Sequence, residues 1–174
     1  MGIRGSVNRL REVQRNLPRW FSRLSVMSTL GIKPPGGCHF PAEGYAEFAR
    51  LMEPVLARGL YHREFAQPVT PPNLQRAYFG NAERSEVVLE FDMPVVWSDR
   101  LVSQFHLDGA ARQVVGGLAE GKTLRLRLQG PTTSPWVTYL DSANWNPDNL
   151  LYGTNGLAAL TFCEVPIEEN PASR

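Results

Sequence analysis

The spacing of hydrophobic residues changes along this chain at a proline-rich stretch, residues 67–72 (Gln-Pro-Val-Thr-Pro-Pro). Before this stretch, apolar residues recur about every 3.6 positions, as in an amphipathic helix, whereas after it they recur at every second position, as in a half-buried strand. Three prolines in five residues favour an extended, semi-stiff connection. The sequence therefore predicts two differently built parts that are joined here.

The first part is expected to contain two helices with a short strand between them. Residues 3–16 have helical periodicity, and so does the stretch that follows Pro41, which should end near Gly59 because glycine suits the position after a helix. In the first helix the arginines are expected on a solvated face, opposite the apolar residues. Residues 24–30 (Leu-Ser-Val-Met-Ser-Thr-Leu) alternate as in a strand, but one strand has no sheet to join. This part therefore looks like the terminal piece of a larger α/β arrangement.

The second part is expected to be a β-sandwich of about 100 residues, because short alternating segments follow one another between glycine-containing turns. The segments with this pattern are residues 87–91, 105–107, 124–128 and 157–165. The predicted fold class is α+β overall, a helix-strand-helix piece followed by an antiparallel β-sandwich. The predicted domains are residues 1–62, a proline-rich linker 63–72, the β-sandwich 73–168 and a tail 169–174.

Composition excludes several classes of function. With 18 Lys and Arg against 17 Asp and Glu, the chain has no electrostatic case for binding nucleic acid or an acidic membrane. No run approaches the ~20 apolar residues of a membrane span, and no secretory signal is visible, so the compartment stays open. Cys38 and Cys163 are too few and too far apart for a zinc site or a disulfide scaffold, and we expect plain buried thiols. No metal or cofactor is predicted.

Residues 116–123 (Gly-Gly-Leu-Ala-Glu-Gly-Lys-Thr) match the phosphate-binding pattern G-x-x-x-x-G-K-[ST]. That chemistry requires the glycine loop to open a helix, so that backbone N–H groups cradle the phosphate. Here a strand-like Leu-Arg-Leu-Arg-Leu follows instead. The sequence therefore predicts a hairpin turn and no nucleotide site.

His39 is the residue best placed for chemistry. It follows Pro-Pro-Gly-Gly, residues 34–37, whose fixed and free φ angles turn the chain sharply just ahead of the second helix. A histidine there can act as a general base if a nucleophile, an orienting group and oxyanion donors lie within reach. A structural or incidental histidine is the other interpretation.

Two stretches carry a resemblance to known families. Residues 36–45 (Gly-Gly-Cys-His-Phe-Pro-Ala-Glu-Gly-Tyr) resemble the last sequence block of SGNH-type hydrolases, usually Asp-x-x-His followed by a proline and a short helix. Residues 137–162 are similar to the C-terminal β-domain of the sialate O-acetylesterase family, with its V-x-Y strand, N-L-Y turn and Gly-Leu-x-Ala-x-x-Phe strand. The matches occur in the expected order and together cover roughly residues 7–167.

The resemblance implies a serine esterase that removes acetyl groups from carbohydrate, with His39 as its catalytic base. Gly36 stands where the family has Asp, so an acid from elsewhere would have to orient His39. The serine and oxyanion blocks are absent, and Ser6, at the start of a basic helix, is rejected as nucleophile. The chain is therefore expected to be the C-terminal portion of such an esterase and inactive alone. It is either a fragment or a chain whose catalytic half comes from a separate polypeptide.

The alternative is a non-catalytic β-sandwich that binds carbohydrate or another protein. Large aromatic faces can stack on sugar rings, although aromatic residues at strand positions usually belong to the core. The candidates for stacking are Trp97, Trp136, Tyr139, Trp145 and Tyr152. Among them Trp145, in the most loop-like stretch, is the predicted substrate-binding residue.

Overall fold

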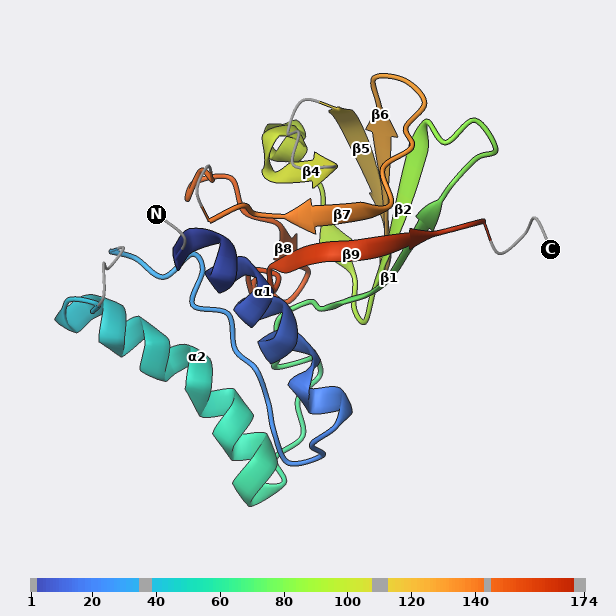
Figure 1. Ribbon diagram of the computed structural model, residues 1–174. Coiled ribbons are helices and arrows are strands. Elements are labelled where there is room, and N and C mark those ends of the chain that lie inside the picture. Colours follow the sequence, from blue (N-terminus) through green and yellow to red (C-terminus); the bar gives the residue numbers. More distant parts are fainter. Residues whose placement is uncertain (1–2, 35–38, 108–112, 143–144, 171–174) are drawn as a thin grey trace.

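The computed structural model describes residues 3–34, 39–107, 113–142 and 145–170 (Figure 1). Within these ranges, two helices precede a part that is mostly strand. In chain order the elements are α1 (Ile3–Asn16), η1 (Leu17–Arg19), α2 (Ala42–Tyr61), β1 (Leu74–Phe79), β2 (Glu86–Phe91), β3 (Val95–Val96), η2 (Asp99–Gln104), β4 (Phe105–Leu107), β5 (Val114–Glu120), β6 (Thr123–Leu128), β7 (Trp136–Tyr139), β8 (Tyr152–Gly153) and β9 (Phe162–Glu168).

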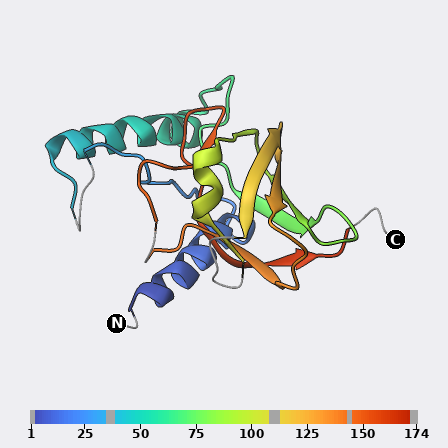
Figure 2. The same cartoon turned by 90° about the horizontal axis from the view of Figure 1, so that it is seen from above.

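Seven strands form one mixed sheet in the order β4-β7-β9-β1-β2-β6-β5, and β3 pairs with β8 separately. The sheet curls around its core and nearly closes like a barrel (Figures 1 and 2). The predicted α+β class is confirmed. The sheet is mixed rather than purely antiparallel, because β9 returns beside β1 in the parallel direction. The last strand also begins later than predicted, at Phe162.

Alternation along the strands separates the core from the surface. Leu89 of β2 lies opposite Leu124 of β6, and both are fully buried. On the opposite face, Arg125 of β6 pairs with Glu86 of β2 at 3.0 Å. Among the aromatic residues of the core, three rings contact one another: Phe105, Tyr139 and Phe162. The β part therefore has a complete hydrophobic interior of its own.

The stretch that matches the phosphate-binding pattern is a hairpin, as predicted. Strands β5 and β6 pair antiparallel, with Glu120 opposite Thr123 across the two-residue turn Gly121-Lys122. Gly121 has a φ of +59°, a left-handed conformation that glycine adopts without steric cost. The lysine and glycines therefore serve a turn between strands and do not open a helix.

Helix α1 packs against β9 and buries Arg15 there, contrary to the prediction that the arginines of this helix are solvated. Arg9, whose side chain is 73% exposed, is solvated as predicted. The Arg15 side chain is 4% exposed and donates hydrogen bonds to Asn73 Oδ1 (2.9 Å) and the Leu74 carbonyl (2.7 Å). Glu12, one turn earlier, accepts two more from the same guanidinium. Arg15 lies inside because the buried Leu74 carbonyl, at the start of β1, needs a hydrogen-bond donor.

The predicted strand at residues 24–30 does not form. These residues are extended, but within the described part of the chain no other strand lies beside them to complete a ladder. This agrees with the expectation that a single strand at residues 24–30 has no sheet to join within this chain.

Helix α2 continues past Gly59, where it was expected to end, as far as Tyr61. His62, with a φ of 54°, takes the left-handed position at its end. Gly59 faces open space, so it lowers helix stability without disrupting any packing. None of the helices described is long and apolar enough to cross a membrane.

The proline-rich stretch runs extended along the β part. Pro71 and Pro72 are buried, and Asn155 donates hydrogen bonds to the carbonyls of Pro68 and Thr70. The segment that connects the helices to the sheet is thus fixed to the β part by these hydrogen bonds. The division into separate domains stays a prediction.

Candidate functional site

His39 lies on the surface, just ahead of the first turn of α2. The adjoining Phe40 ring packs over Gly44, where an added Cβ would lie 2.9 Å from the Phe40 Cβ. The same ring meets Tyr45 edge-on, with ring centroids 5.8 Å apart. Glycine at position 44 therefore lets Phe40 fix the direction of the chain at His39 and the position of Tyr45.

The His39 ring has a defined partner in Tyr45. Its Nδ1 lies 3.2 Å from the Tyr45 hydroxyl oxygen. In the tautomer with hydrogen on Nδ1, this atom donates to the Tyr45 oxygen and leaves the lone pair on Nε2, the arrangement a general base needs. A neutral phenol thus occupies the place that a carboxylate takes in a Ser-His-Asp triad.

No carboxylate among the described residues pairs with His39. Two acids lie on the first turns of α2: Glu43, and Glu47, which pairs with Arg50 at 2.6 Å. The hydrogen bond from Arg50 lowers the pKa of Glu47, so this acid stays ionised. Gly36, where the resemblance leads one to expect an acid, and Cys38 lie outside the described residues.

The β part touches the chain that leads to His39. The Tyr152 hydroxyl packs against Gly31, at 2.6 Å from the position an added Cβ would take. Gly31 has a φ of +80°, so it combines a left-handed backbone with a close approach that requires glycine. Lys33 lies 4.0 Å from Asp148 on the loop that follows Trp145. The loop carrying Trp145 is therefore adjacent to residues 31–33, a few positions before His39 in the sequence.

One of the five aromatic candidates for sugar stacking belongs to the interior, and a second is partly buried. Tyr139 is fully buried, its hydroxyl oxygen accepts the Leu151 N–H at 2.6 Å, and burial raises its pKa. Trp97 packs over Gly117 and donates to Asp99. Tyr139 was therefore wrongly included among the stacking candidates, whereas Trp97 packs against the core with part of its surface still accessible.

Trp145 and Trp136 keep accessible faces, and Trp145 is 40% exposed. Trp136 begins β7 opposite Pro166 of β9. Trp145 lies on the loop between β7 and β8. The exposure is consistent with stacking on a ligand, and the role of Trp145 stays a prediction.

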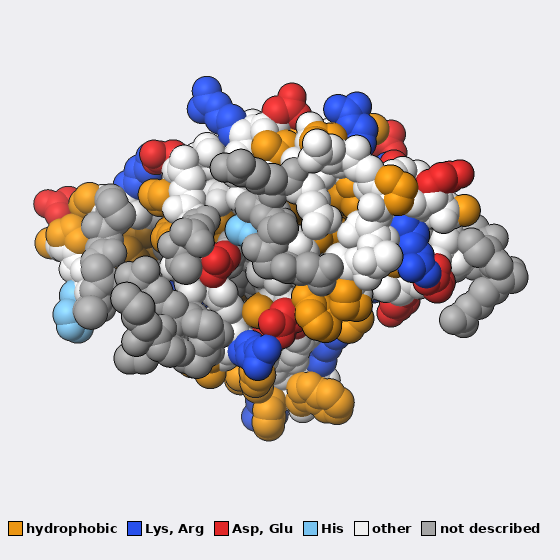
Figure 3. Space-filling view, turned by 45° about the horizontal axis from the view of Figure 1, so that its top comes forward, with side chains coloured by type: hydrophobic (Ala, Val, Ile, Leu, Met, Phe, Trp, Pro, Cys, Tyr) orange, Lys and Arg blue, Asp and Glu red, His pale blue; other side chains and the backbone are white. Residues whose placement is uncertain are grey.

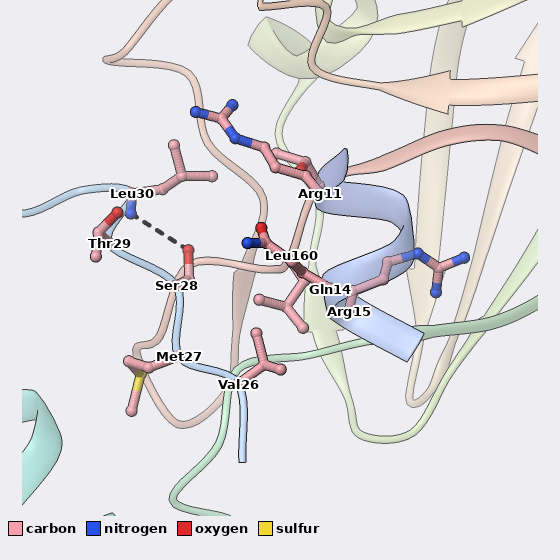
Figure 4. A pocket seen from close by; sticks show the side chains of 10 residues that line it. Arg11, Gln14, Arg15, Val26, Met27, Ser28, Thr29, Leu30 and Leu160 are labelled. Carbon is pink, nitrogen blue, oxygen red and sulfur yellow. Dashed lines mark hydrogen bonds between the residues drawn. The ribbon is translucent and has the colours of Figure 1, made fainter. Parts of the chain in front are cut away.

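A small cleft of about 150 Å³ lies between α1 and residues 26–30 (Figure 4). Arg11 and Gln14 reach over it from the helix, and Leu160 lies at its floor. Opposite them, the Leu30 N–H donates to the Ser28 hydroxyl at 3.3 Å (Figure 4). The cleft shows that α1 and the extended segment are incompletely packed against one another.

Sequence reasoning did not single out His106, which is buried on β4. Its Nε2 has no hydrogen-bond partner within the ranges described. Burial lowers the pKa of His106, and the Asp141 carboxylate opposes this shift by less. No pattern in the sequence marks this histidine, because its burial arises from long-range packing.

Cys163 is a half-buried free thiol, and burial raises its pKa. A high pKa keeps the sulfur protonated, which makes it a poor nucleophile and a poor metal ligand. Ser6, rejected as nucleophile, lies within α1. In the described ranges no group of three or more His, Cys, Asp or Glu residues is suited to hold a metal ion.

The sequence matches no protein-family model and no curated protein. Among solved structures, the chain is similar to a carbohydrate acetylesterase from Xanthomonas citri, with a TM-score of 0.52 and 18% sequence identity. The match covers 75% of this chain and 30% of that one. At this identity the similarity shows the fold, and the chain spans about three-tenths of that enzyme's length.

Proposed function

We propose that this chain is the C-terminal portion of a carbohydrate O-acetylesterase of the SGNH type, similar to the sialate O-acetylesterases. It contributes His39 as catalytic base and a β part beside it, while the serine nucleophile and the oxyanion donors lie outside this sequence. The fold similarity to a carbohydrate acetylesterase supports this proposal. The substrate would be an acetylated carbohydrate.

The geometry of His39 carries the proposal. The ring is exposed, Tyr45 binds its Nδ1, and no described group bonds to its Nε2. Here one nitrogen is oriented and the other is available to an incoming hydroxyl, which is the requirement for a base that activates serine.

In the proposed reaction, His39 Nε2 takes the serine proton as the oxygen attacks the acetyl carbonyl, and returns it to the sugar alkoxide as that group leaves. His39 then activates water to release acetate. Tyr45 holds the ring in the tautomer and orientation that this requires. A phenol stabilises imidazolium less than a carboxylate does, so catalysis would be weaker than in a complete triad.

The test uses hydrolysis of O-acetylated sugars, with His39→Asn compared against His62→Asn. His62 is a second exposed histidine at the other end of α2, so it controls for loss of any surface imidazole. The chain alone should release acetate no faster than its His39→Asn variant. Together with the unit that carries the nucleophile, it should lose about 10²–10⁴-fold in rate on His39→Asn and nothing on His62→Asn.

Tyr45→Phe separates the orienting role from the base itself. It removes the hydroxyl but keeps the ring contact with Phe40, so the loss should be about tenfold, the equivalent of one hydrogen bond. Rapid hydrolysis by the chain alone that disappears in His39→Asn would place the nucleophile within this sequence and contradict the proposal.

A second candidate function is a non-catalytic module that binds carbohydrate or protein, favoured by the exposed indole of Trp145. In this case a glycan array probed with the chain should show binding that Trp145→Ala abolishes and Trp136→Ala leaves in place. Binding that survives Trp145→Ala would remove this residue from the site.

A further inference from the structure

Helix α2 carries an apolar stripe on the side that faces away from the rest of the chain. Its members are spaced four, three, four and four residues apart, which places them on one face of a helix. They are Tyr45, Ala49, Met52, Leu56 and Leu60. Leu56 is 50% exposed and Leu60 67% exposed. This is the side that a surface helix normally buries.

The opposite side of α2 is the one that faces the protein. Glu43, Glu47 and Arg50 line a depression together with Gly31 and Lys33. This side also carries Ala57, which is buried, and Leu51 and Pro54, which line a second depression with Val69 and Leu157. The helix is therefore apolar on two sides, and only one of them packs on this chain. The apolar stripe of α2 is thus an unpartnered face.

Helix α1 also exposes apolar residues. Arg15 and Arg9 face the sheet, where Arg9 pairs with Glu164 at 3.1 Å. On its other side Leu10 is exposed and Val13 is 60% exposed. Hydrophobic side chains accordingly reach the surface in several places in the space-filling view (Figure 3). Two helices that independently expose their apolar sides indicate one missing partner.

The segment of residues 24–30 runs between these helices in both ribbon views (Figures 1 and 2). Within the described part of the chain, no backbone N–H or C=O of residues 25–29 bonds to another backbone group. Ser28 is nevertheless buried. An extended run of backbone groups without backbone partners can pair with a strand from another sheet.

We propose that residues 24–30 form a strand onto which an α/β domain outside this sequence adds its own sheet edge. The two helices would then cover the two faces of the combined sheet, because the segment lies between them. Strand pairing satisfies the backbone of residues 25–29, and the outward stripes of α1 and α2 become buried against the added strands or their helices.

The size of the solved relative supports this occupant. The match covers 30% of that enzyme, so 70% of it lies outside the match. In that enzyme the shared fold is therefore part of a larger protein. A second copy of this chain could pair its own residues 24–30 with this strand. The helices of that copy would then occupy the space beside the apolar stripes, where added strands are needed. An open α/β sheet satisfies both the backbone and the stripes.

This inference rests on the proposed function in one respect: the docked domain is taken to be the source of the serine. Tyr45, the hydrogen-bond partner of His39, is also the first member of the α2 stripe. A domain that covers the stripe would therefore lie beside the free nitrogen of His39. Docking and assembly of the active site would be the same event.

The test places photoreactive benzoylphenylalanine at Leu56, in cells that express the protein, and identifies the cross-linked peptide by mass spectrometry. The matched control carries the same group at Val115, which is similarly exposed on β5. Cross-linking is expected from position 56 only, to a peptide of an α/β domain. Ser25→Pro, which removes a strand N–H, should abolish it, and Ser25→Ala should not.

Protection of the β2 amides against hydrogen exchange checks that Ser25→Pro remains folded. A cross-link to another copy of this chain, equal cross-linking from positions 56 and 115, or no effect of Ser25→Pro would each overturn the docking proposal. If the α/β domain cross-links but the complex releases no acetate, docking stands and the esterase proposal fails. If a His39-dependent esterase forms without cross-linking at position 56, the docking proposal fails alone.

Discussion

The β part of this chain buries its large hydrophobic residues, whereas the helical part leaves several of them exposed. In the β part, alternation sends residues such as Leu89 and Leu124 into a closed core and leaves Glu86 and Arg125 outside. In the helical part, Arg15 is buried while Leu60 of α2 is exposed. The first part encloses its own hydrophobic core, whereas the second leaves apolar side chains exposed, as the docking proposal requires.

The sharpest test of this comparison is a pair of identical substitutions, Leu89→Ala and Leu60→Ala. Leu89 is fully buried, so its truncation should lower the free energy of unfolding by about 2–5 kcal/mol. Leu60 is 67% exposed, so the same change should cost about 0.5 kcal/mol or less. Urea unfolding measures both. Equal losses would mean that α2 is packed in solution and that the comparison is wrong.

The buried arginine gives the next largest effect. Arg15→Met should lower the free energy of unfolding by about 3 kcal/mol, because Glu12 and the Leu74 carbonyl lose their buried partner. Arg9→Met, which removes the exposed pair with Glu164, should cause no measurable change. Thermal unfolding of the two variants measures both changes in stability. A neutral Arg15→Met would show that α1 is only loosely attached to the sheet.

A smaller effect concerns His106 in the β part. Burial lowers its pKa in the folded state below the value near 6.5 of an unfolded chain, so the unfolded state binds the proton more readily. Stability from the neutral ring is therefore complete above about pH 6.5 and is lost as the pH falls, with a slope of at most about 1.4 kcal/mol per pH unit.

The check is urea unfolding between pH 7 and pH 5 of the parent chain, His106→Gln and His62→Gln. The His106 variant should lose part of the pH dependence, while the exposed His62 variant should keep it. If His106→Gln leaves the slope unchanged, other groups account for the acid sensitivity of the β part.

Much of the fold followed from local patterns. Helix α1, the position of α2, the hairpin at Gly121 and strands β2 and β6 were predictable because each rests on spacing within one segment. The parallel pairing of β1 with β9 was not, since it joins residues about ninety positions apart. The end of α2 was missed because a glycine in open space can be tolerated inside a helix.

The candidate site was predictable in part. The prolines and glycines around His39 indicate a turn ahead of a helix, and the structure places His39 there. The partner, Tyr45, could have been suspected from Phe40 and Gly44, which together bring the phenol back toward the loop. The burial of Arg15 on α1 could not have been predicted, because amphipathicity shows two faces of a helix but not which one meets the rest of the protein.

Hydrogen exchange on the isolated chain tests the central claim most directly. Because residues 25–29 have no backbone partner in the described structure, their amides should exchange as fast as in an unstructured peptide. The amides of residues 87–89 in β2 should exchange only on global unfolding. Protection of residues 25–29 equal to that of β2 would show that the strand is already paired and that no partner is missing.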